Sequence, residues 1–89
     1  MKKEIELAYE RLPKLLTKFG FNKAYVRNEN ENLAIILCEQ KQPLSLSKWL
    51  DIETFIKLDI SRNIILLGQE QIDNLDGYLL IKGSEQHDS

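Results

Sequence analysis

The sequence predicts a small α/β (α+β) domain, with helices packed on one mixed β-sheet. Two segments carry apolar residues three or four positions apart, which indicates amphipathic helices. Short apolar runs between polar turns indicate strands. A chain of 89 residues can build one hydrophobic core, so we expect a single domain over residues 1–83 and a disordered tail over residues 84–89.

The first helix is predicted from an apolar stripe that ends at Phe19, directly before Gly20; the stripe consists of Ile5, Ala8, Leu12, Leu15 and Phe19. Pro13 lies inside this stripe. Because proline lacks an amide hydrogen and clashes with the preceding turn, it predicts a kink or a break near Leu12.

A β-hairpin is predicted next, with strands over residues 21–27 and 33–38 joined by an Asn- and Glu-rich turn. The second strand is apolar without alternation, which indicates burial on both faces of the sheet. Residues 64–67 show the same pattern and predict another strand covered on both faces.

A second main helix is expected from Ser45 or Ser47, either of which can cap it, to about Asp59. Its apolar residues fall mostly on one side, which predicts that they face the core: Leu46, Trp49, Leu50, Ile52, Phe55 and Ile56. A short helix over residues 69–75 is a weaker expectation. The Asp76-Gly77 turn then predicts a last strand over residues 78–81.

Charge and composition narrow the functional classes. The net charge is −2, divided into +4 over residues 1–28 (seven Lys/Arg and three Glu) and −6 over residues 29–89 (five Lys/Arg and eleven acids). This asymmetry falls short of the basic surface typical of nucleic-acid-binding proteins. The charged N-terminal segment is unlike a secretory signal, and no apolar run is long enough for a membrane helix, so we expect a cytoplasmic protein.

Residues typical of catalysis or metal binding are poorly placed. The single histidine, His87, lies in the predicted tail, where it cannot be held against a substrate, and the single cysteine, Cys38, lies inside an apolar strand. Three acidic pairs are better explained as solvated turn or helix residues than as metal ligands: Glu29 with Glu31, Asp51 with Glu53, and Asp73 with Asp76. We therefore expect no catalytic residue, metal or cofactor.

Four segments follow one another in a distinctive order of helix and strand patterns: residues 16–26 (LTKFGFNKAYV), 32–37 (NLAIIL), 43–56 and 63–67 (NIILL). This order, over about residues 4–68, resembles that of minimal nucleotidyltransferases of the DNA polymerase beta-like superfamily. The resemblance implies a trimmed version of that fold, because the helix that follows the first strand in the family is replaced here by a turn.

The catalytic signature of that family is missing. Arg27-Asn28 stands where the family has its Gly-Ser pair, and the metal-binding aspartates would fall near Asn32, Ala34 and Ile65. Amide and aliphatic side chains do not supply the carboxylate oxygens that magnesium needs. The resemblance therefore implies a relative without catalysis.

Three functional hypotheses remain open at this stage. The first is a non-catalytic interaction or regulatory protein. The resemblance implies an antitoxin-like role, because minimal nucleotidyltransferases pair with all-helical toxins. Trp49 could anchor the partner, although we favour a core position for it, and self-association is an alternative. The second is a module that binds a nucleotide or small molecule, its anion received by Lys18, Lys23 and Arg27. The third is an unrelated α+β adaptor.

Overall fold

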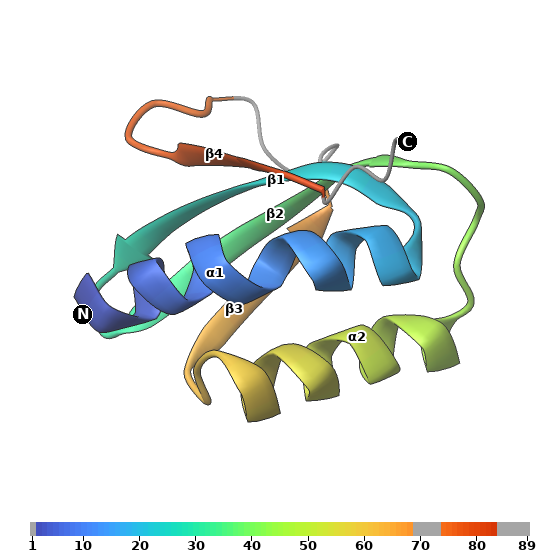
Figure 1. Ribbon diagram of the computed structural model, residues 1–89, viewed down its shortest axis with the longest axis horizontal. Helices are drawn as coiled ribbons and strands as arrows, with labels where there is room; N and C mark the ends of the chain where they lie inside the picture. The colour runs from blue at the N-terminus through green and yellow to red at the C-terminus, as the bar shows by residue number, and fades with distance from the viewer. Residues whose placement is uncertain (1, 69–73, 84–89) are drawn as a thin grey trace.

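The computed structural model describes residues 2–68 and 74–83, in which two helices pack on a four-stranded mixed sheet (Figure 1). This confirms the predicted fold class. The strand order in the sheet is β3-β2-β1-β4. Along the chain the elements are α1 (Lys2–Phe19), β1 (Phe21–Glu29), β2 (Asn32–Gln40), α2 (Leu46–Asp59), β3 (Ile64–Gly68) and β4 (Leu79–Lys82).

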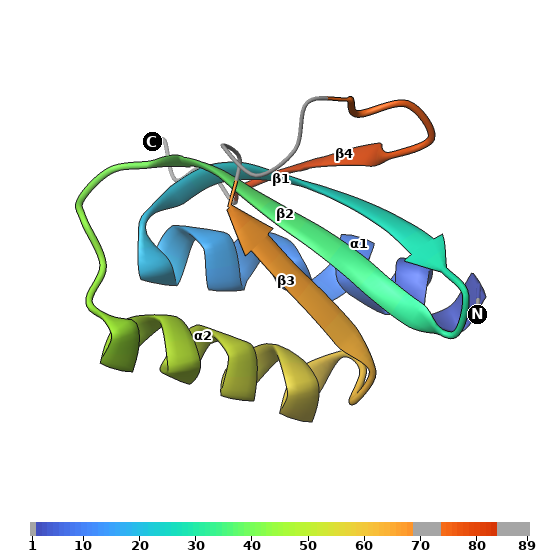
Figure 2. The same cartoon turned by 180° about the vertical axis from the view of Figure 1, so that it is seen from behind.

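The centre of the sheet is the predicted hairpin of β1 and β2. The two strands run antiparallel with Tyr25 opposite Ile36, and Asn30 in the turn has a φ of 59°, a left-handed conformation that asparagine tolerates. β3 pairs in parallel with the other edge of β2, which requires the long crossover that α2 provides (Figure 2). β4 pairs antiparallel with the free edge of β1.

Both helices cover the same face of the sheet, as the two opposite views show (Figures 1 and 2). α1 contributes Ala8, Leu12 and Leu16 to the core, and α2 contributes Ile52 and Ile56. Alternate residues of the strands pack against these helix residues: Ala24, Val26, Leu33, Ile35, Leu37 and Ile81. The two helices and this face of the sheet thus share one hydrophobic cluster.

The opposite face of the sheet is also apolar along β2. Ala34, Ile36 and Cys38 are buried there, so the prediction that this strand is buried on both faces is confirmed. The same prediction for the strand at 64–67 is wrong, because all five residues of β3 are half-buried. β3 lies at the edge of the sheet, and no other strand of the described residues pairs with its outer side.

α1 runs without interruption through Pro13, so the predicted break near Leu12 is wrong. Leu12 and Leu16 are buried on either side of the proline, and their packing on the sheet holds both halves in one helix. The Thr17 hydroxyl donates to the Pro13 carbonyl at 3.2 Å. The helix ends where expected, at Gly20. This residue has a φ of 85°, a conformation that glycine adopts without steric cost.

Of the two predicted caps, Ser45 and Ser47, the structure uses the first: the Ser45 hydroxyl accepts a hydrogen bond from the Lys48 amide at 3.2 Å. The predicted last strand is confirmed as β4, which follows Gly77 at a φ of 83°. The short helix expected over residues 69–75 and the tail over residues 84–89 lie largely or wholly outside the described residues. In the part of the chain that is described, neither helix has the length and apolar character needed to cross a membrane.

Candidate functional site

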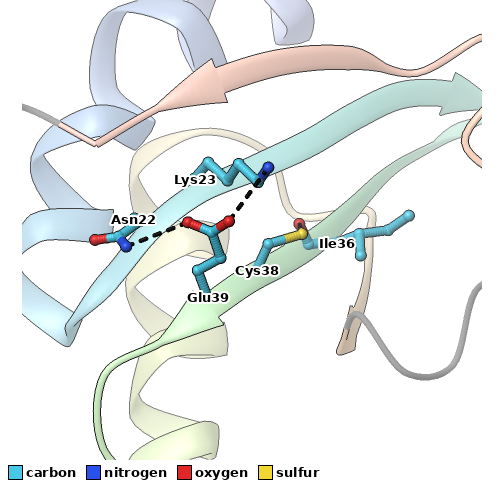
Figure 3. A network of polar contacts seen from close by, with 5 residues as sticks. All are labelled: Asn22, Lys23, Ile36, Cys38 and Glu39. Carbon is cyan, nitrogen blue, oxygen red and sulfur yellow. Dashed lines mark hydrogen bonds and ion pairs between the residues drawn. The ribbon is translucent and has the colours of Figure 1, made fainter.

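A polar network lies where β1 begins and β2 ends, on the face of the sheet away from the helices (Figure 3). Asn22 donates from its side-chain amide to Glu39 Oε1 at 3.2 Å, and Lys23 Nζ lies 3.4 Å from Glu39 Oε2. Both carboxylate oxygens of Glu39 therefore have a partner. The backbone of Glu39 has a φ of 57°, a conformation that residues other than glycine and asparagine rarely adopt.

The network shifts the proton affinities of its two charged members. The hydrogen bond from Asn22, followed by the contact with Lys23, lowers the pKa of Glu39 below its ordinary value of 4.5. The hydrogen bond and charge of Glu39 raise the pKa of Lys23. Both groups keep their charges at neutral pH, which suits a structural ion pair rather than a proton-transfer site.

We expect Glu39 to titrate below 4.5 in carbon-detected NMR of the folded protein. A carboxyl whose pKa is lowered on folding stabilises the native state above its unfolded pKa, and this contribution is lost as the pH falls through the folded pKa. Asn22→Ala removes the hydrogen bond that lowers the pKa of Glu39 most, so it should move the titration midpoint upward. A Glu39 midpoint at or above 4.5 in the unchanged chain would contradict the network.

Cys38 is buried beside this network, on the same face as Lys23, with its thiol directed at the Ile36 carbonyl at 3.7 Å. Burial raises the pKa of the thiol, which keeps it protonated and unreactive at neutral pH. We expect Cys38 to react with an aromatic disulfide reagent only after unfolding in urea. Labelling of the native protein at the rate of a free thiol would show that the sheet face opens at this point.

Arg27 is occupied by contacts within the chain. Its guanidinium donates to Glu29 Oε1 at 3.3 Å and to the Asp76 carbonyl at 3.2 Å, and it lies 4.5 Å from the centre of the Tyr78 ring. These contacts fasten the segment that leads into β4 against β1. Arg27 therefore has a structural role, because it connects β1 to the segment that contains Asp76 and Tyr78.

The three cations predicted to receive an anion do not form one site. Lys23 and Arg27 lie on β1 and face away from the helices. Lys18 lies in the last turn of α1, in the helical layer, with its ammonium 4.3 Å from the centre of the Phe55 ring on α2. The sheet separates the first two from the third, so one small anion would not contact all three.

Trp49, the predicted partner anchor, is half-buried and packs against the core cluster. Trp49 thus lies where a core-packing residue would, which is the alternative that we favoured from the sequence. Other apolar residues of α2 point outward instead: Leu46 is 74% exposed, Leu50 51% and Leu58 81%. The prediction that Leu46, Leu50 and Phe55 face the core is wrong, because α2 meets the sheet only along the narrow side that carries Ile52 and Ile56.

The exposed leucines lie along one line on the helix. Leu46, Leu50 and Leu58 are separated by multiples of four residues, with Thr54 completing the row, and such i±4 rows are the ridges that helices pack into the grooves of other helices. At 1.5 Å per residue the row is about 18 Å long. We call Leu46, Leu50, Thr54 and Leu58 the α2 ridge. Sequence reasoning missed it because Leu46 and Leu50 were assigned to the core and Leu58 was not considered.

The acidic pairs whose two members are both described, Glu29 with Glu31 and Asp51 with Glu53, do not gather into a metal site. Within residues 2–68 and 74–83, no group of three or more His, Cys, Asp and Glu side chains lies close enough to hold an ion. Glu29 pairs with Arg27, and Glu53 pairs with Lys57 at 3.2 Å. Asp73 and His87 lie outside the described residues.

Comparison with known proteins gave no match to any family model, curated protein or solved structure. The resemblance to minimal nucleotidyltransferases therefore stays a prediction. Function has to be argued from the surfaces of this chain.

Proposed function

We propose that this protein is a non-catalytic interaction module that docks a helix of a partner protein on the α2 ridge. The observation that carries the proposal is the exposure of three leucines in one row on a regular helix. Single exposed apolar residues are common on soluble proteins, but leucines that recur along one row of an ordered helix are typical of an interaction surface. A ridge of i±4 residues fits the groove of a second helix.

The charges beside the ridge define the chemistry of the partner. By the 3.6-residue period, Asp51 and Glu53 lie on opposite sides of the row near its middle. Glu53 forms an ion pair with Lys57 at 3.2 Å, so the net negative charge beside the ridge comes from Asp51. A helix with an apolar stripe flanked by Lys or Arg would match this surface in shape and in charge.

The same charges disfavour a second copy of this chain as the occupant. A two-fold axis through the middle of the ridge would bring Asp51 of one copy near Asp51 of the other. Like charges placed together at an interface cost binding free energy. We therefore propose a heteromeric partner.

A role without catalysis agrees with the groups found so far. The pKa of Cys38 is raised by burial, and Lys23 and Glu39 neutralise one another in an ion pair. The nucleotidyltransferase resemblance implies the same role, since it lacks the metal-binding aspartates and points to a helical partner. An antitoxin-like function is one specific form of this proposal.

The test is the affinity of a reconstituted complex. A partner recovered from the source cells is produced on its own, and its Kd is measured calorimetrically against the unchanged chain, Leu50→Glu, Leu58→Glu and the matched control Leu80→Glu. Leu80 is also an exposed leucine, but it lies on β4. We expect the ridge variants to weaken binding at least about 30-fold, as an interface hot spot does, and the control to bind normally.

Two results would contradict the proposal. One is an equal loss of affinity for Leu80→Glu and the ridge variants, which would place the interface elsewhere. The other is a purified chain that sediments as a dimer and becomes a monomer in Leu50→Glu, because the ridge would then be occupied by a second copy.

A further inference from the structure

A cavity of about 300 Å³ opens at the end of α1, and none of the four residues of the α2 ridge lines it. One wall is the last turn of the helix, residues 17–20, and the other is the loop after β2, with Lys41, Gln42 and Leu44. The Lys41 amide donates to the Gly20 carbonyl at 2.8 Å, so the two walls are joined by a backbone hydrogen bond. The cavity is at the lower end of the size range of ligand sites.

Two lysines with uncompensated charges line this cavity. Lys18 and Lys41 form no ion pair within the described part of the chain, whereas Lys23 and Lys57 each have a carboxylate partner. The described contacts of Lys18 are with the rings of Phe19 and Phe55, which leave its three ammonium donors without an oxygen acceptor. The local charge of the cavity is therefore positive.

The remaining wall is suited to an apolar group. Phe19 and Leu44 line the cavity while packing against the core cluster, which fixes them in place. Two carbonyls at the end of α1 already accept hydrogen bonds: that of Thr17 from the Gly20 amide at 3.3 Å, and that of Gly20 from Lys41. This reduces the negative potential that a helix C-terminus would otherwise present to an anion.

We infer that this cavity binds a small organic anion, a phosphate or carboxylate group attached to a compact apolar body. Lys18 and Lys41 would receive the anion from opposite walls, and Phe19 and Leu44 would contact the apolar part. At about 300 Å³ the cavity lies at the small end of the range of ligand sites, which favours a compact ligand. This inference does not depend on the proposed docking of a partner helix.

The experiment titrates the full chain with phenyl phosphate and follows backbone amide shifts by NMR. We expect saturable binding, with the largest shifts in residues 17–20 and 41–44. Lys18→Gln and Lys41→Gln should each weaken the Kd about tenfold, because each removes a charge-assisted hydrogen bond. Lys3→Gln carries the same change of charge on α1, about 22 Å along the helix, and should leave the Kd unchanged.

Two further ligands separate the parts of the inference. Benzyl alcohol has the ring without the anion, and inorganic phosphate has the anion without the ring, so both should bind more weakly than phenyl phosphate. Equal weakening in Lys3→Gln and Lys41→Gln would overturn the site, since it would show attraction by net charge alone. Equal affinity for inorganic and phenyl phosphate, or shifts that do not saturate, would overturn it as well.

Discussion

Replacing Ile35 with alanine is expected to lower the free energy of unfolding by about 2–5 kcal/mol. Ile35 lies in the middle of β2, is fully buried, and has Val26 on one neighbouring strand and Leu66 on the other at the same level. Its side chain belongs to the cluster beneath both helices, so the truncation leaves a cavity that surrounding elements cannot all close. Small domains are stable by only about 5–15 kcal/mol, which makes this a severe loss.

The matched control is Leu58→Ala, which removes a side chain of the same size from the outer side of α2. Leu58 is exposed, and we expect its variant to stay within about 0.5 kcal/mol of the unchanged chain. Urea unfolding followed by circular dichroism measures both. Equal losses for the two variants would mean that the outer side of α2 is buried in the isolated chain and is not a free surface.

Replacing Pro13 with alanine is expected to raise the free energy of unfolding by about 1–3 kcal/mol. Pro13 lies inside a continuous helix, where it supplies no amide hydrogen to the preceding turn. Alanine restores that donor and has the highest helix propensity. The buried residues on both sides, Leu12 and Leu16, are unchanged by the substitution, so the gain should appear in full.

Lys14→Ala is the control for this second prediction. Lys14 is the next residue of α1 and is exposed, so its variant changes helix propensity little and should shift stability by no more than about 0.5 kcal/mol. The midpoint in urea should rise for Pro13→Ala with an unchanged slope. A fall in the midpoint would show that the proline sets a bend on which the packing of α1 depends.

The positions of the elements could be predicted from the sequence, and the physical reason is local. The hairpin turn, the Ser45 cap and the stop at Gly20 depend on backbone preferences of single residues, and each is found where expected. The effect of Pro13 could not be predicted in the same way. Whether a proline breaks a helix depends on how strongly its neighbours are held by tertiary packing, which a sequence window does not contain.

The candidate site was harder to predict, because it depends on the orientation of elements in space. The apolar residues of α2 extend around more of the helix than one face can bury. Which of them stay exposed depends on how α2 is oriented as it connects the parallel strands β2 and β3. Lys18 and Lys23 are five residues apart, yet the change from helix to strand puts them on opposite sides of the sheet. Lys41 and Lys18 are far apart in the sequence, and the fold brings both to the lining of one cavity.

The central claim is that the α2 ridge is the docking surface for a helix of another protein. The most direct measurement places a photo-reactive phenylalanine analogue at position 50 of the full chain in the source cells. Position 31, in the exposed turn between β1 and β2, serves as the control. We expect irradiation at position 50 to yield one adduct of this chain with a different protein, attached through a helix, and position 31 to yield none. An adduct of two copies of this chain, no adduct, or the same adduct from both positions would contradict the claim.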